Sequence, residues 1–120
     1  MIKILIFDDD LDFITSVTRA LKKCEIRVVS VHSLQNADSY LKLDTFKETE
    51  LIVMDACMPG NKPNTMSLIE KIIAMGYKKP IIAASSKEEY SQVLVKAGAT
   101  HYSTKAGIVG EILKVLEVNG

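Results

Sequence analysis

The sequence predicts an α/β fold, a parallel sheet of five strands covered on both faces by helices. Short apolar runs alternate with segments of helical spacing along all 120 residues. Most of these runs are rich in β-branched residues, and several are followed by turn-forming or acidic residues. This alternation implies right-handed crossovers between parallel strands, because each helix must pack back onto the sheet.

Five runs are expected to form the strands: residues 2–7, 26–31, 51–55, 80–84 and 100–104. Apolar runs of this length, bounded by turns, are typical of strands that are buried on both faces of a parallel sheet. We therefore expect a single core layer on each side of the sheet.

The intervening segments have apolar residues three or four positions apart, which indicates amphipathic helices. The predicted buried faces are, in chain order, Phe13, Val17, Ala20 and Leu21; Leu34, Ala37 and Leu41; Ile69, Ile72 and Ile73; Tyr90, Val93, Leu94 and Ala97; and Ile108, Ile112 and Leu116. Ser33 and Thr65 are expected N-caps, and Gly76 and Gly98 are expected helix ends.

Composition favours one globular domain over residues 1–120. Hydrophobic residues make up 48% and charged residues 25% of the chain, and the formal net charge is zero. This balance argues against direct nucleic-acid binding, which usually requires a basic excess. Cys24 and Cys57 lack zinc-ligand spacing, and no apolar stretch approaches the length of a membrane span. We expect a cytoplasmic protein that does not bind a membrane.

Acidic residues follow two of the predicted strands. Asp55 ends the run 51–55, and Asp8, Asp9 and Asp10 follow the run 2–7. Ligands of open α/β sheets bind at the carboxyl ends of the strands, so these carboxylates are expected to meet at one edge. Such a cluster of negative charge predicts a bound cation.

The residues at the strand ends occur in the order and spacing of a known family. They are Asp8-Asp9, Asp55 with Met58-Pro59-Gly60, Ser85, and Lys105 after Gly98-Ala99-Thr100-His101-Tyr102. Over the whole chain from Ile4 to the last helix, the sequence resembles the receiver domain of response regulators in bacterial two-component signalling. The resemblance implies a flavodoxin-like, doubly wound sheet with strand order 2-1-3-4-5 and five flanking helices.

By this resemblance Asp55 is the phosphoacceptor, whose carboxylate attacks a phosphoryl donor. Asp8 and Asp9 would hold one Mg²⁺ together with Asp55 and the backbone carbonyl of Cys57, which is an oxygen-only ligand set suited to this ion. Asp9 is expected to bind the metal directly and Asp8 through water.

The resemblance also assigns roles around the phosphoryl group. The ammonium of Lys105 would neutralise its charge, and Ser85 would act as a switch that donates a hydrogen bond to it. Tyr102 would be the aromatic ring coupled to the movement of Ser85. Cys57 and Lys87 occupy positions that tune the lifetime of the acyl phosphate, and we expect a long-lived phosphoryl state.

The implied function is a phosphorylation-dependent signalling switch, rather than an enzyme with a separate substrate. A histidine kinase or phosphotransfer protein would supply the phosphoryl group. An output protein or effector domain would bind the face formed by residues of about 87–118, and homodimerisation is left open.

Two other functions are open from the residues alone. One is a phosphate-independent pseudo-receiver that serves as a scaffold. The other is a phosphatase of the haloacid-dehalogenase type, because Asp8 and Asp10 have the D-x-D spacing of that class. The Gly and Thr residues expected after that motif are missing, which disfavours the phosphatase.

Two departures from the family pattern bear on the site. Ala106 follows Lys105 where the family usually has proline, so the Lys105–Ala106 peptide bond could be cis or trans; the cis form would cost about 2.5–4 kcal/mol without proline. The loop of residues 61–65 is about two residues longer than usual, which could bring Lys62 near the phosphate.

Overall fold

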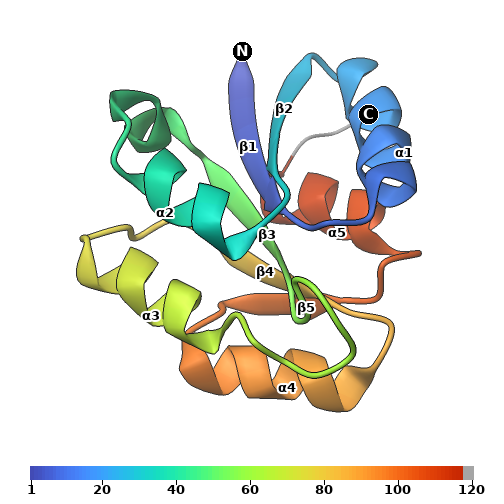
Figure 1. The fold of residues 1–120 in the computed structure, drawn as a ribbon. Helices are drawn as coiled ribbons and strands as arrows, with labels where there is room; N and C mark the ends of the chain where they lie inside the picture. Colours follow the sequence, from blue (N-terminus) through green and yellow to red (C-terminus); the bar gives the residue numbers. More distant parts are fainter. Residues whose placement is uncertain (118–120) are drawn as a thin grey trace.

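The computed structural model describes residues 1–117 and shows five parallel strands in one sheet (Figure 1). The strands are β1 (Ile2–Phe7), β2 (Ile26–Val31), β3 (Leu51–Asp55), β4 (Ile81–Ala84) and β5 (His101–Ser103). The helices are α1 (Leu11–Lys22), α2 (Leu34–Leu41), α3 (Met66–Ala74), α4 (Glu88–Ala97) and α5 (Ile108–Val115), with a 3₁₀ helix η1 (Asp44–Glu48) before β3. The sheet order β2-β1-β3-β4-β5 confirms the predicted fold.

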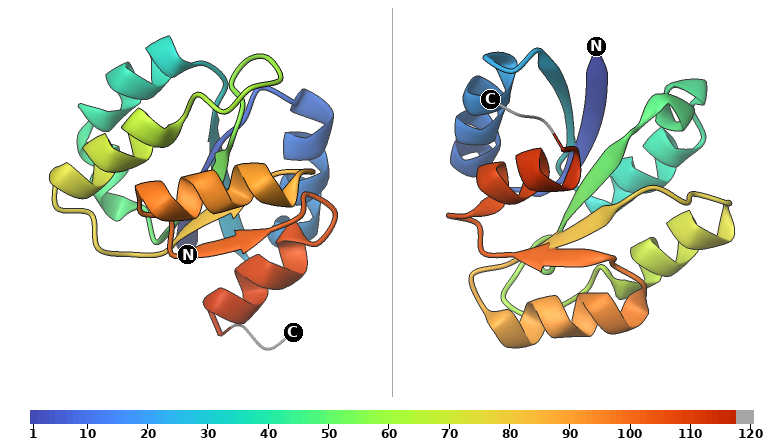
Figure 2. Two further views of the ribbon diagram at one scale, coloured as in Figure 1. Left: turned by 90° about the horizontal axis from the view of Figure 1, so that it is seen from below. Right: turned by 180° about the vertical axis from the view of Figure 1, so that it is seen from behind.

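The sheet separates two apolar layers because side chains alternate along each strand. Ile4 and Ile6 of β1 pack on one face with residues of α1 and α5. Leu5 and Phe7 pack on the opposite face with residues of α2, α3 and α4. Figures 1 and 2 show these two helical layers on either side of the strands. All parallel strands therefore end at the same edge, between the layers.

Three predicted helix boundaries are confirmed by backbone geometry. The Ser33 hydroxyl caps α2 by accepting a hydrogen bond of 3.0 Å from the Asn36 N–H. Gly76 and Gly98 follow α3 and α4 with φ of 95° and 129°, a region that favours glycine. Gly98 also packs so closely that a Cβ there would collide with the Ile73 side chain. Asp10 caps α1, its Oδ1 accepting from the Phe13 N–H at 3.1 Å.

Some predicted buried faces are rotated from their expected positions. Leu34, Ile73 and Val93 are 36%, 41% and 38% exposed, so their prediction as buried residues is wrong. Ile14, Leu68 and Ser91 are buried instead. The reason is that each helix has more apolar side chains than can face the sheet. The packing geometry of the helix on the sheet, and not polarity alone, decides which of them are buried. In α4 even a serine is selected.

The 3₁₀ helix η1 is a feature that the sequence pattern did not reveal. Its Phe46 is buried, with ring centroids 6.4 Å from Tyr40 and 5.8 Å from Tyr77. The buried ammonium of Lys3 on β1 donates to the Thr45 carbonyl and lies 5.5 Å from the centroid of the Tyr40 ring. These contacts fasten η1 to the amino-terminal end of the sheet.

The peptide bond after Lys105 is in the ordinary trans form. Within residues 1–117 the cis peptide bond is Met58–Pro59, so Lys105–Ala106 is trans. No helix among these residues is both long and apolar enough to cross a bilayer. Residue 118, the end of the predicted partner-binding face, lies outside the described residues, as do the last two residues of the predicted domain.

Candidate functional site

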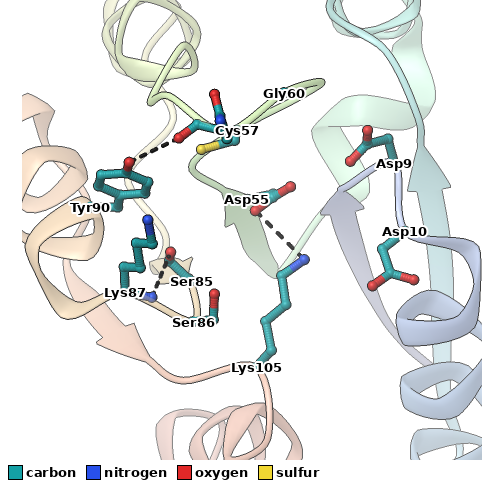
Figure 3. A pocket seen from close by; sticks show the side chains of 11 residues that line it. Asp9, Asp10, Asp55, Cys57, Gly60, Ser85, Ser86, Lys87, Tyr90 and Lys105 are labelled. Carbon is teal, nitrogen blue, oxygen red and sulfur yellow. Dashed lines mark hydrogen bonds and ion pairs between the residues drawn. The ribbon is translucent and has the colours of Figure 1, made fainter.

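The loops that follow β1, β3, β4 and β5 surround a pocket of about 510 Å³ at the carboxyl edge of the sheet (Figure 3). The residues that line it are Asp9, Asp10, Asp55, Cys57, Gly60, Asn61, Ser85, Ser86, Lys87, Tyr90 and Lys105. Six residues predicted from the sequence are therefore brought together, and they come from four separate loops. The parallel sheet explains this, since its strands deliver their last residues to one edge.

Three carboxylates form the acidic part of the site. Asp8, Asp9 and Asp55 each offer an oxygen, and these oxygens all lie within 4.8 Å of one another. Asp8 is fully buried and Asp55 is 7% exposed, whereas Asp9 is open to solvent. Like charges at this separation repel in a poorly solvated site, so the cluster favours binding of a cation.

Lys105 supplies the opposing charge. Its Nζ lies 2.9 Å from Asp8 Oδ2 and 3.7 Å from Asp55 Oδ1, and it also lies 4.9 Å from the centroid of the Phe13 ring. Burial would lower the pKa of Lys105, but the close contact with Asp8 and the charge of Asp55 outweigh burial and raise it. The ammonium therefore stays charged beside Asp55, and Ala106 does not prevent this placement.

The surroundings of the Asp55 carboxyl raise its pKa toward neutral pH. Burial, and then the charge of Asp8, raise the pKa of Asp55 from 3.8 to about 7, although Lys105 and the backbone N–H of Cys57 act in the opposite direction. A single lysine thus does not neutralise the cluster. An additional positive charge would be needed to keep Asp55 fully ionised at neutral pH.

The residues present fit a divalent metal ion. Asp8 Oδ1 accepts a hydrogen bond of 2.9 Å from the Asp10 N–H, and the buried Asp8 Oδ2 lies 2.9 Å from the Lys105 ammonium, with no other partner among the described residues. A carboxylate oxygen with one partner can still accept a second contact. Together with the oxygens of Asp9 and Asp55, it provides the hard oxygen ligands that Mg²⁺ prefers.

Ser85 lies at the far wall of the pocket, at the end of β4. Its Oγ accepts a hydrogen bond of 3.1 Å from the Lys87 N–H, and the residue is 7% exposed. Because the oxygen accepts this bond, the hydroxyl hydrogen remains available to a group in the pocket. Figure 3 shows Ser85 across the pocket from Asp9 and Asp10.

Tyr102 and Lys62 do not line this pocket. Tyr102 is 50% exposed and borders a separate cavity of about 200 Å³ that it shares with Ser85 and Ser91. Lys62 is exposed, and the suggestion that the longer loop brings it to the site finds no support in the geometry. The residues after β3 that line the pocket are instead Cys57, Gly60 and Asn61.

Cys57 is partly buried at the wall of the pocket. Burial and the charge of Asp55 raise the pKa of its thiol, and the charge of Lys87 only partly offsets them. A raised pKa disfavours the reactive thiolate. The side chain therefore acts as a small wall residue, and the use of its backbone carbonyl as a metal ligand stays a prediction.

Two positioning residues were missed in the sequence. Thr65 immediately precedes α3 at the predicted N-cap position, but its hydroxyl does not cap the helix. It donates instead to the carbonyls of Asp55 and Ala56 at 2.7 and 3.2 Å. The Asn64 side chain accepts from the Met58 N–H at 2.7 Å and donates to the Pro59 carbonyl at 3.2 Å. Both residues lie at the end of the loop that follows β3, and their hydrogen bonds hold the beginning of that loop in place next to Asp55.

Tyr90 was predicted only as part of an apolar helix face. Its hydroxyl donates to the Asn61 carbonyl at 2.8 Å, which joins α4 to the loop after β3. The Lys87 ammonium lies 5.0 Å from the centroid of its ring. Tyr90, Asn61 and Lys87 thus form one wall of the pocket, which we call the Tyr90 latch. Figure 3 shows Tyr90 and Lys87 next to each other on this wall.

Solved structures with the same fold include several that are distant in sequence. A response regulator receiver protein from Pseudoalteromonas atlantica is 16% identical, with a TM-score of 0.77 over 96% of this chain and 97% of that one. A two-component response regulator from Clostridium difficile is 17% identical, with a TM-score of 0.77 over 98% of both chains. A response regulator protein from Burkholderia pseudomallei, solved with a phosphorylated aspartic acid, calcium ion and citrate, is 21% identical, with a TM-score of 0.76 over 99% of this chain and 68% of that one.

The sequence itself gives a family assignment. No curated protein matches the chain. The family model for the response regulator receiver domain matches residues 4–117, which include every helix described above and every strand except the first two residues of β1. The match and the fold lead to one conclusion: the chain belongs to the response regulator receiver domain family.

Proposed function

We propose that this domain accepts a phosphoryl group on Asp55 in a Mg²⁺-dependent reaction. The observation that carries the proposal is the convergence of Asp8, Asp9 and Asp55 with Lys105 at one edge of the sheet. A phosphorylated aspartic acid and a calcium ion in the Burkholderia pseudomallei relative support it. The donor would be a phosphohistidine of a histidine kinase or phosphotransfer protein.

In the transfer, the ionised carboxylate of Asp55 attacks phosphorus. An O–P bond forms while the P–N bond breaks, and the histidine ring leaves with the bonding electron pair. Mg²⁺ held by Asp9, Asp55, the Cys57 carbonyl and, through water, Asp8 would neutralise phosphoryl oxygens and keep Asp55 ionised. Lys105 contributes a second positive charge beside Asp55.

The phosphorylated state would be sensed through Ser85 and the Tyr90 latch. The Ser85 hydroxyl hydrogen can be donated to a phosphoryl oxygen while the Lys87 N–H remains bound to Oγ. A shift of Ser85 would reach Tyr102, which borders a cavity with it. The partner surface would be α4, β5 and α5, read by an output protein, an effector domain or a second copy as a population shift between two conformations.

Two observations weigh against the alternatives. A pseudo-receiver scaffold would not require Lys105 to reach both Asp8 and Asp55, which it does despite Ala106. A haloacid-dehalogenase phosphatase would need Asp10 in the reacting pair, whereas Asp10 is engaged in capping α1. We propose a switch without a separate substrate, within a single domain over residues 1–120.

The test is incubation with acetyl phosphate, with and without Mg²⁺, followed by intact-mass measurement. One metal-dependent phosphoryl adduct is expected in the native chain and none in Asp55→Asn. Asp12→Asn, at an exposed acid in the first turn of α1, is the matched control and should label normally. Labelling of Asp55→Asn, or equal labelling in a chelator, would refute the assignment.

A further inference from the structure

A second pocket lies at the opposite, amino edge of the sheet. It has a volume of about 430 Å³ and lies among the end of α2, η1, Thr49 and the segment 75–79 after α3. Thr49 precedes β3 and the segment 75–79 precedes β4, so the pocket adjoins the strand starts rather than the strand ends. None of its lining residues belongs to the Asp55 site.

The apolar floor of this pocket is built from side chains that the fold holds in place. Phe46 is 5% exposed and contacts the Tyr77 ring, and Leu41 beside them is also buried, whereas the half-exposed Leu43 and Met75 lie at the pocket's outer part. The Tyr77 hydroxyl is directed to the Pro80 carbonyl at 3.4 Å. The Lys3–Thr45 hydrogen bond fixes η1 from beneath. The floor is therefore suited to an aromatic ring or a short acyl chain.

One polar group in the lining is unsatisfied. Thr49 is 1% exposed and lines the pocket, and its Oγ1 makes no hydrogen bond within the described residues. A buried hydroxyl without a partner costs free energy, and native structures rarely leave one without a reason. Oγ1 itself is shielded, so a polar ligand atom would remove this cost once the Thr49 side chain turns toward the pocket.

The rim of the pocket is predominantly basic. Lys42, Lys47 and Lys78 line it and form no ion pair with any carboxylate of residues 1–117. Lys79 is already paired with Glu50 at 2.9 Å, and Asp44 is the single acid in the lining. In a chain with a formal net charge of zero, this is a local excess of positive charge around an apolar pocket.

We propose that this pocket binds a small amphipathic carboxylate. Its apolar body would lie against Phe46 and Tyr77, and its carboxylate would bind the rim lysines and accept the Thr49 hydroxyl hydrogen. The volume is at the lower end of the range of about 300–1,000 Å³ for small-molecule sites, so the body would be one ring or a short chain. The site would make this receiver domain responsive to a metabolite independently of Asp55.

The probe for the test is octanoate, added to the ¹⁵N-labelled full chain while amide chemical shifts are recorded. Octanol and octylammonium are the matched controls, because they have the same chain with a neutral or a cationic head. The shifts should be confined to residues 41–49 and 75–79, and octanoate should bind about tenfold more tightly than either control. Equal binding of the three probes, or shifts outside these segments, would overturn the proposal.

Two variants separate recognition from folding. Thr49→Val removes the unpartnered hydroxyl while retaining the shape, and Lys47→Ala combined with Lys78→Ala removes two rim charges. Each should weaken octanoate binding by about fivefold or more, with the amide spectrum of the free protein retained. Lys23→Ala, at an exposed lysine after α1, is the control and should bind normally. Unchanged affinity in both pocket variants would contradict the site, whatever the outcome of phosphorylation at Asp55.

Discussion

The two edges of this sheet carry pockets of similar size but opposite construction. At the carboxyl edge, charged groups from four loops face one another, and two of the acids, Asp8 and Asp55, are buried. At the amino edge, an aromatic floor is surrounded by lysines on the rim, and the buried polar group is a neutral hydroxyl. The difference shows that strand ends of a parallel sheet concentrate charge by topology alone, whereas a pocket at the strand starts requires an inserted element, here η1.

The largest effect is expected from breaking the charge pairing at the carboxyl edge. Lys105→Ala leaves Asp8 buried beside Asp55 without a cation, which should lower the free energy of unfolding by about 3–5 kcal/mol in a chelator. Urea denaturation measures this, and Mg²⁺ should restore part of the loss. Lys79→Ala, which removes a half-exposed pair with Glu50, should change stability by less than about 1 kcal/mol. Similar values for the two variants would mean that the edges do not differ as described.

The second prediction concerns pH. The pKa of Asp55 is raised in the folded state, so folding favours its protonated form and is penalised as pH rises from about 4 to above 7. Asp55→Asn should therefore stabilise the metal-free protein by about 2 kcal/mol at pH 8, allowing for relaxation of the site, and by little at pH 4. Chemical denaturation at both pH values, in a chelator, measures the difference. A gain that is independent of pH would contradict the raised pKa.

A matched pair of threonines compares the edges with the same substitution. Thr65→Val deletes the hydroxyl that donates to the Asp55 and Ala56 carbonyls and should cost about 1–3 kcal/mol. Thr49→Val deletes a buried hydroxyl without a hydrogen bond and should be neutral or stabilising by about 1 kcal/mol. Thermal unfolding of both variants checks the sign. Destabilisation of equal size would show that Thr49 is satisfied after all.

The smallest effect concerns the Tyr90 latch. Tyr90→Phe removes the hydrogen bond to the Asn61 carbonyl but keeps the ring under the Lys87 ammonium. The loss should cost about 0.5–1.5 kcal/mol of stability and open the pocket to both phosphodonor and water. The rates of phosphorylation by acetyl phosphate and of spontaneous dephosphorylation should both rise a few-fold. Tyr102→Phe, at a half-exposed ring outside the pocket, should leave the labelling rate near the native value.

The site at the carboxyl edge was largely predictable, because its charged residues lie at the ends of strands that the sequence pattern identifies. Asp8 follows the first apolar run, Asp55 ends the third and Lys105 follows the fifth. The topology of the sheet therefore brings the three residues together. The roles of Thr65 and Tyr90 were not predictable, since their hydroxyls contact carbonyls 10 and 29 positions away. Neither distance follows from a local pattern.

The amino edge was not predicted at all. Five residues with Phe46 as their single apolar member are too few to show periodicity, so η1 is invisible in the sequence. Its pocket depends on Phe46 meeting Tyr40 and Tyr77, which come from separate segments. The rim lysines have ordinary surface positions in the sequence, and only the fold places them around one cavity.

The enclosed ammonium of Lys3 makes this residue a built-in reporter. Because its nitrogen is covered by η1, an amine-reactive reagent should modify Lys3 far more slowly than the exposed lysines. Any modification that precedes global denaturation would register a partial opening of residues 44–48. Mass-spectrometric footprinting at Lys3 would thus measure the rate at which this single helical turn opens, without any engineered label.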